Sequence, residues 1–332
     1  MAPGSLSRNR QVSIGDPLSQ VAFLCAKEGL RVRCLIIALS VVIITAAGGV
    51  AIAAAPGRMV TDMLGLRVRI PEMPRRIVSL APSVTEVVFA LGQGHRLCGV
   101  TRFSDYPAAA QALPKVGSYV QLDLERIVSL RPDLCIAVKD GNPKAVVARL
   151  ESLGIPVFAL DPRDLSAVLE TISALGGLLD VQDAADTIVA DLEKRIQAVV
   201  HRRGRLGRPP GVFFQIGLSP IVSVGTDTFI HELIMLAGGV NLSAGPVPYP
   251  RFSQEEVIAM APDLIIITSM AREGAFEEIR RDWLRWKNMP AARTGGIVLV
   301  DSNLLDRASP RLVDGLERLA DIIHAADRAV KP

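Results

Sequence analysis

The chain has 332 residues, of which 49% are hydrophobic and only 4% aromatic, and its formal net charge at pH 7 is +3. This length is sufficient for two domains, each with a core of its own. The charge is small, and no basic stripe is interleaved with aromatic residues, which argues against nucleic acid as a partner.

An uncharged apolar run, LIIALSVVIITAAGGVAIAAA, occupies residues 35–55, and Arg31 and Arg33 precede it. Basic residues, an apolar stretch and a small-residue end are typical of a secretory signal peptide. The run is also long enough to span a bilayer. We therefore interpret residues 1–55 as a signal peptide or a membrane anchor, and we expect the rest of the chain to be periplasmic or otherwise extracytoplasmic.

Residues 56–74 are interpreted as a linker or as the start of the mature protein, and residues 75–162 as an N-terminal α/β lobe. In that lobe apolar, strand-like runs alternate with helical patterns, which predicts a mostly parallel sheet. The expected strands are 76–80, 97–100, 134–138 and 156–160, and the expected helices are 83–92, 123–130 and 143–153. Ser83 and Glu86 have the spacing of a capping box at the first of these helices.

The four cysteines divide between the leader and the first lobe. Cys25 and Cys34 belong to the leader, whereas Cys98 and Cys135 lie in apolar, strand-like stretches. In an oxidising compartment the latter two are compatible with a disulfide and equally with two buried thiols.

Residues 163–208 are predicted to connect the lobes through helices alone. Ile188, Leu192, Ile196 and Val199 form one apolar stripe. A helix of about 20 residues is roughly 30 Å long. We therefore expect one long backbone helix that joins the two lobes.

Residues 209–332 are interpreted as a C-terminal α/β lobe with strands at 212–216, 264–268 and 297–301. An internal repeat supports this division: LERIVSLRPDLCIAV (124–138) aligns without a gap with QEEVIAMAPDLIIIT (254–268). Each copy reads as a short helix, a proline break and a buried strand. The fold class is thus α/β, with two similar lobes, and a ligand is expected between them, outside the carboxyl ends of the strands.

Motifs of catalysis are missing, since the chain has no G-x-S-x-G, H-E-x-x-H or Walker A sequence. None of its histidines, which are His95, His201, His231 and His324, pairs with another at metal-ligand spacing. We therefore expect no catalytic residue, no metal and no cofactor.

Three loops that follow expected strands or precede expected helices hold aromatic residues. These loops are TRFSDYP (101–107), VGSYVQLDLE (116–125) and PVPYPRFS (246–253), with Phe103, Tyr119 and Tyr249. A single aromatic residue in such a loop equally often covers the surface of a lobe. Together, in a chain so poor in aromatic residues, the three indicate a wall for a large flat ligand.

The order of several motifs resembles the periplasmic substrate-binding proteins of ABC importers that have a helical backbone. The motifs are RIVSLAPSVTEVVFALG, SDYP, LERIVSLRPDLCIAV, LGIPV, VFFQIG, GGVNL, VPYPRFSQEEV and DRASPR. Among these proteins the chain is most similar to the cobalamin-binding branch, whose relatives also take ferric siderophores and haem. The resemblance covers residues 75–325.

The resemblance implies which residues contact a ligand and a partner. Its ligand-binding positions fall on Phe103, Tyr119, Tyr249, Arg307 and Asn303, with Asp301 close to the last. Two further aromatic positions of the family hold Val138 and Val222 here. Glu125 and Glu255, at the starts of matching helices, correspond to glutamates that dock onto arginines of a dimeric permease.

We therefore expect a monomeric solute-binding protein that captures a corrinoid, such as cobalamin, between its lobes and delivers it to an ABC permease in the membrane. A haem or ferric-siderophore binding protein of the same fold is the first alternative. A secreted enzyme that uses the same cleft is the second, and the missing catalytic motifs argue against it.

Overall fold

The computed structural model of the protein describes residues 57–204, 206–217, 219–268 and 273–330. The expected leader at residues 1–55 lies outside the described residues. Within these ranges, no helix has the length and apolar character that crossing a membrane requires.

The first parallel sheet has the strand order β4-β3-β5-β6. Its strands are β3 (Ile77–Ser79), β4 (Leu97–Gly99), β5 (Leu134–Val138) and β6 (Val157–Leu160). Side chains alternate between the two faces, as a strand requires. Ile136 belongs to the apolar cluster on one face, and Cys135 and Ala137 belong to the cluster on the other.

Helices cover both faces of this sheet. On one face pack α2 (Pro82–Ala90) and α5 (Leu165–Leu178), and on the other pack α3 (Leu124–Ser129) and α4 (Lys144–Ser152). Two short 3₁₀ turns, η1 (Gly94–Arg96) and η2 (Ala108–Ala112), lie in the connections around β4. The alternating pattern of strands and helices thus produces the expected doubly covered sheet.

The second parallel sheet has the order β12-β11-β7-β9. Its strands are β7 (Gly211–Gln215), β9 (Val240–Asn241), β11 (Leu264–Ile267) and β12 (Ile297–Leu299). On one face lie α7 (Phe229–Leu236) and α12 (Leu312–Val330), and on the other lie α8 (Gln254–Ala259), α9 (Glu273–Leu284) and α10 (Pro290–Thr294). The short α11 (Ser302–Leu305) follows β12. The prediction of an α/β fold with two similar, mostly parallel sheets is confirmed.

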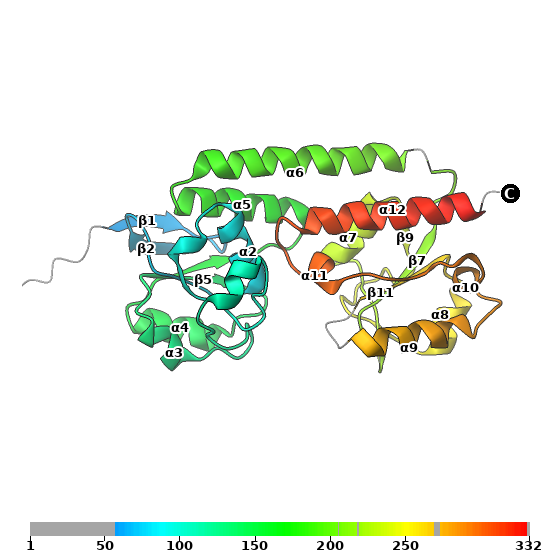
Figure 1. The fold of residues 1–332 in the computed structure, drawn as a ribbon, viewed down its shortest axis with the longest axis horizontal. Helices are drawn as coiled ribbons and strands as arrows, with labels where there is room; N and C mark the ends of the chain where they lie inside the picture. Colours follow the sequence, from blue (N-terminus) through cyan, green and yellow to red (C-terminus); the bar gives the residue numbers. More distant parts are fainter. Residues whose placement is uncertain (1–56, 205, 218, 269–272, 331–332) are drawn as a thin grey trace, which may run out of the picture. The chain divides into compact units, whose positions relative to one another are not determined.

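The expected backbone helix is α6 (Gln182–Arg203), which buries Ala185, Leu192 and Val199. Figure 1 shows it running beside α5 and α12, and both helices contact it. Arg195 of α6 also donates hydrogen bonds to Asp314 and Glu317 of α12, at 2.5 and 2.6 Å. The helix therefore binds elements of both lobes, while the boundaries at residues 162 and 208 stay predictions.

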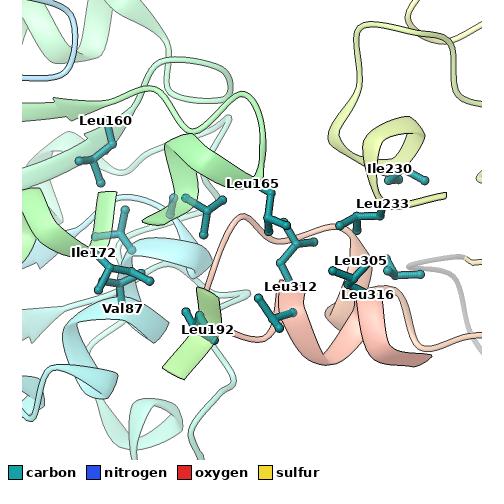
Figure 2. Close-up of a cluster of buried hydrophobic side chains, with 14 of the residues drawn as sticks. Val87, Leu160, Leu165, Ile172, Leu192, Ile230, Leu233, Leu305, Leu312 and Leu316 are labelled. Atoms are coloured by element: carbon teal, nitrogen blue, oxygen red, sulfur yellow. The ribbon is translucent and has the colours of Figure 1, made fainter. Parts of the chain in front are cut away.

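A single apolar cluster continues from the first lobe into the second. Figure 2 shows it extending from Val87 and Ile172 through Leu165 and Leu312 to Leu316, and all five side chains are buried. Separating the lobes would expose this apolar surface to water, which costs about 25 cal/mol of free energy for each Å² exposed. The shared core therefore opposes a wide opening of the lobes.

The internal repeat has the same structure in both lobes. Residues 124–138 form α3 and β5, and residues 254–268 form α8 and β11. Arg131 and Ala261, at matching positions, have φ values of 48° and 49°. This left-handed conformation is uncommon for residues other than glycine. The two copies of the repeat therefore share an uncommon backbone conformation as well as their sequence pattern.

The aspartate of each PDL sequence fastens its repeat to a neighbouring strand. Asp133 accepts hydrogen bonds from the backbone N–H of Arg75 and Arg76, just before β3. Asp263 accepts one from the N–H of Gly211, the first residue of β7, at 2.7 Å. Each aspartate thereby satisfies backbone donors that the sheet leaves unpaired.

The interpretation of residues 56–74 as a linker is wrong for most of its length. Strands β1 (Gly57–Thr61) and β2 (Arg67–Pro71) pair antiparallel as a hairpin. The Asp62 carboxylate accepts hydrogen bonds from the N–H groups of Leu64 and Leu66, which fixes the turn. Arg58 donates to the Gly177 and Leu178 carbonyls at the end of α5.

Two further strands, β8 (Ile221–Val222) and β10 (Arg251–Phe252), pair antiparallel and were not expected from the sequence. Like β9, each of these strands is only two residues long. A two-residue strand shows no alternation of polar and apolar positions that the sequence could reveal.

The two cysteines of the first lobe are free thiols. Cys98 lies on β4 and Cys135 on β5, with β3 between them. Burial raises the pKa of Cys135 to about 12, and the neighbouring Cys98 and Asp133 add to the effect. Of the two alternatives expected from the sequence, a disulfide and two free thiols, the structure contains the free thiols.

We predict that Asp263→Ala lowers the free energy of unfolding by about 1–3 kcal/mol, because it leaves the buried Gly211 N–H without an acceptor. Urea unfolding monitored by circular dichroism measures this. Asp321→Ala, which breaks only an exposed pair with Arg202, is the control and should cost about 0–1 kcal/mol. Equal losses in the two variants would contradict the role assigned to Asp263.

Candidate ligand-binding site

A cavity of about 1670 Å³ lies between residues of the two lobes. From the first lobe it is lined by the segments that follow β3, β5 and β6, and from the second by the segment that follows β12. These are carboxyl ends of parallel strands, where α/β folds place their ligands. The cavity is larger than the roughly 300–1,000 Å³ of common small-molecule sites, so it has room for a large ligand.

The three predicted aromatic residues all line this cavity. The rings of Phe103 and Tyr119 meet edge to face, with centroids 6.1 Å apart. Tyr249 comes from the second lobe and is 57% exposed. Of the two valines at the other aromatic positions of the family, Val138 lines the cavity. The aromatic side chains thus present open apolar surface to the cavity from both lobes, and their contact with a ligand stays a prediction.

Asn303 and Arg307 line the cavity as well, and their binding of a ligand stays a prediction. The Arg307 guanidinium is already engaged by the protein. Its Nη1 donates to Glu86 at 2.9 Å and to Asp105 at 2.7 Å, and its Nη2 donates to the Phe103 carbonyl at 3.1 Å. All three acceptors belong to the first lobe, so Arg307 joins the lobes across the cavity wall.

Glu86 is the centre of this contact between lobes. Its side chain is only 2% exposed. Besides the bond from Arg307, it accepts a hydrogen bond from the Ser309 hydroxyl at 2.7 Å and two from the Arg311 guanidinium at 2.9 and 2.8 Å. Arg311 also lies over the ring of Tyr106, 3.9 Å from its centroid. A charge so far from water requires partners of this kind.

The capping box predicted for α2 is wrong. The N-cap is Ala81 with no side-chain bond, and Pro82 begins the helix. Glu86 turns instead toward the second lobe, among buried neighbours that include Val84, Val87 and Val88. An acidic residue within a valine-rich helical face is a sequence signal of a buried charge, and that signal was available in SVTEVVFALG.

Carboxylates predominate among the charged residues of the cavity wall. Two arginines, Arg163 and Arg307, face nine acidic side chains there. The acidic residues are Asp105, Asp140, Asp161, Asp164, Asp227, Glu232, Glu277, Asp301 and Asp306.

Some of these carboxylates are occupied by the protein and others are open to a ligand. Asp161 pairs with Lys139 and Arg163, and Glu232 accepts a hydrogen bond from the Leu165 N–H. Among the described residues, no group donates a hydrogen bond to the carboxylate of Asp140 or Asp306. These two therefore have acceptor oxygens to offer.

Asp306 has a displaced pKa. The surrounding cavity walls exclude enough water to raise it to about 6, although the side chain stays open to the cavity; Arg307 opposes the rise and Asp301 adds to it. The same environment raises the pKa of Tyr249, first through burial and then through Asp140 and Asp306. Burial in the cavity wall thus places the pKa of the Asp306 carboxyl at about 6, well above its usual value of 3.8.

The two predicted docking glutamates lie away from the cavity. Glu125 and Glu255 occupy the first turns of α3 and α8, and both are exposed. They stand at matching positions of the repeat, one in each lobe. In the described part of the chain, no group of three or more His, Cys, Asp or Glu side chains is arranged to hold a metal ion.

We predict that Glu86→Ala lowers the free energy of unfolding by about 3 kcal/mol or more, because it removes the buried carboxylate that balances the charges of Arg307 and Arg311. Glu170→Ala, an exposed change on α5, should stay within about 0.5 kcal/mol of the parent protein. Chemical denaturation of both variants measures the difference. If Glu86→Ala were as stable as Glu170→Ala, the buried charge would not hold the lobes together.

Comparison with known proteins agrees with this architecture. The family described as periplasmic binding protein matches residues 77–304. The vitamin B12-binding protein of Yersinia pseudotuberculosis serotype O:1b is 28% identical over 265 residues, which cover 80% of this chain and 91% of the relative.

Solved structures show the same similarity. The periplasmic vitamin B12-binding protein of Vibrio cholerae has a TM-score of 0.67 and 28% identity, and the match covers 76% of this chain and 98% of that one. A periplasmic haem-binding protein from Pseudomonas aeruginosa has a TM-score of 0.68 and 30% identity, covering 76% and 93%. These relatives are binding proteins and not enzymes. The chain therefore belongs to the periplasmic binding protein family of ABC importers, which implies a small-molecule ligand, a permease partner and a place outside the cytoplasm.

Proposed function

We propose that this protein captures a corrinoid of the cobalamin type between its lobes and delivers it to a membrane permease. The observation that carries the proposal is a large cavity that combines aromatic side chains from both lobes with an excess of carboxylates. A corrinoid is a broad macrocycle fringed by neutral amide groups. Its faces suit aromatic contacts, and its amide N–H groups are donors that suit unpaired carboxylate oxygens.

Haem is the second candidate, because haem-binding proteins are among the similar structures. The charge of the cavity disfavours it. Haem carries two propionates, and the carboxylates of the cavity wall, which outnumber its arginines, would repel them. An anionic ferric siderophore meets the same repulsion.

Delivery requires a surface that a permease recognises. Glu125 and Glu255 place one exposed carboxylate on each lobe, at matching sites on α3 and α8. A dimeric permease with a basic pocket on each half would be complementary to this pair. Such charge pairs mainly determine register and association rate. A monomeric binding protein, held outside the cytoplasm by its leader or released by cleavage of it, fits this arrangement.

The direct test is a titration of the purified protein with cyanocobalamin, haemin and ferric siderophores, followed by intrinsic fluorescence or calorimetry. We expect saturable binding of cyanocobalamin that is tighter than the binding of haemin. Tighter binding of haemin would favour the second candidate.

Within that titration, Tyr119→Ala should weaken cyanocobalamin binding about threefold to tenfold, since an aromatic contact contributes about 0.5–1.5 kcal/mol beyond its burial. Trp286→Ala, which removes an exposed aromatic side chain outside the cavity, is the control and should leave the affinity unchanged. Unchanged affinity after replacing Phe103, Tyr119 and Tyr249 together would remove the cavity assignment.

Binding of cyanocobalamin should strengthen severalfold as the pH rises from about 5 to 7. The reason is that Asp306 loses its proton near pH 6, and hydrogen bonds to a charged acceptor are about 1 kcal/mol stronger than neutral ones. The stability of the free protein should depend on pH in the opposite direction. Because the pKa of Asp306 is higher in the folded protein than the usual 3.8, Asp306 stabilises the fold at pH values below 3.8. This contribution is lost as the pH rises through about 6.

Asp306→Asn should flatten the pH dependence of cyanocobalamin binding. It should also reduce the loss of thermal stability between pH 4 and 7. A pH profile of binding that is the same in both proteins would show that Asp306 does not contact the ligand.

In membrane vesicles that contain the permease, Glu125→Ala combined with Glu255→Ala should abolish stimulated uptake while leaving the affinity for soluble ligand intact. Glu151→Ala with Glu278→Ala removes the same charge from exposed positions, one in each lobe, and should transport normally. Normal uptake by the first double variant at physiological salt would mean that its glutamates serve only their helices.

A further inference from the structure

Arg307 lies in the cavity wall, although a ligand rich in neutral amides has no carboxylate for its guanidinium to bind. A guanidinium in the wall of a cavity is a strong binding site for carboxylates, which it holds by two parallel hydrogen bonds. Left free, Arg307 would attract the propionates of haem, or a corrinoid in which one amide has been hydrolysed to a carboxylate.

The structure shows how this cation is balanced. Arg307 and Arg311 face Glu86 and Asp105, so the four formal charges of the cluster sum to zero. The two acids differ in their exposure. The side chain of Glu86 is 2% exposed and holds both arginines in place, whereas that of Asp105 is 51% exposed and lies in the cavity wall. Asp105 is thus the partner that a ligand would meet.

We propose that Asp105 is a specificity-determining residue, which occupies Arg307 so that the cavity rejects ligands with a carboxylate at this position. A ligand carboxylate would have to displace Asp105 from Arg307 and leave two negative charges side by side. A neutral amide requires no such exchange and finds acceptor oxygens instead.

The surroundings of Asp105 support this role. Its N–H donates to the Phe103 carbonyl at 3.1 Å, and the same carbonyl accepts from Arg307. The loop that brings Phe103 to the ligand therefore also fixes Asp105. Burial acts to raise the pKa of Asp105, but the bonds from Arg307 outweigh it and the pKa is lowered. The residue is therefore charged at neutral pH.

This inference rests on the proposed function only in naming the corrinoid, because the charge rule applies to any ligand of the cavity. We would test it with two pairs of ligands that differ only in carboxylates. One pair is cyanocobalamin and its monocarboxylic acids, made by hydrolysing one propionamide at a time. The other is haemin and its dimethyl ester. The measured quantity is the ratio of the dissociation constants of the acid and its neutral partner.

Asp105→Ala should lower this ratio at least about tenfold for one of the acids, because Arg307 becomes available for a charge-assisted hydrogen bond. Asp105→Asn removes the charge but keeps an acceptor of the same shape, so its ratio should fall between those of the parent and Asp105→Ala. Asp227→Asn is the matched control. Asp227 is an exposed carboxylate of the cavity wall to which we assign no ligand contact and which no described arginine pairs with, so the ratio should change less than about threefold.

A merely structural role of Asp105 would change the affinity for both members of a pair equally, and an unchanged ratio would overturn the proposal. So would an equal effect of Asp227→Asn, which would mean that only the total charge of the cavity matters. If the parent protein binds haemin but not cyanocobalamin, the proposed function fails, and the haemin pair still tests Asp105.

Discussion

The buried charge of Glu86 constrains most of what surrounds the cavity. A carboxylate that is 2% exposed must find its compensation within the protein. Its partners are Arg307, Ser309 and Arg311, which all come from one segment of the other lobe. That segment joins α11, at the cavity wall, to α12, which packs on the backbone helix. One ionic contact therefore fixes the position of the ligand site and of the interface between the lobes together.

Two other features act in the same direction. The apolar cluster of Figure 2 passes from one lobe into the other, and α6 contacts helices on both sides. These contacts oppose a large change in the separation of the lobes. We therefore expect small adjustments of side chains, rather than a wide closure of the lobes, when a ligand binds.

Local patterns predicted those parts of the structure that depend on local sequence. The repeat of residues 124–138 and 254–268 predicted one helix–strand unit per lobe, and the apolar stripe around Leu192 predicted α6. The hairpin β1–β2 was missed although Arg67, Val68, Arg69 and Ile70 alternate in polarity. The partners of Glu86 lie more than 220 residues away, and no periodicity encodes such a pairing. The excess of carboxylates was missed for the same reason, since Asp140, Asp161 and Asp306 meet only after the two lobes have folded together.

A crystal structure of the complex with cyanocobalamin would test the central claim most directly. The account predicts the corrin ring between Tyr119 and Tyr249, with amide groups directed at Asp140 and Asp306. It also predicts that Arg307 and Arg311 remain on Glu86, as they are in the free protein. A ligand bound outside this cavity, or an Arg307 that has left Glu86 and Asp105 to hold the ligand, would contradict it.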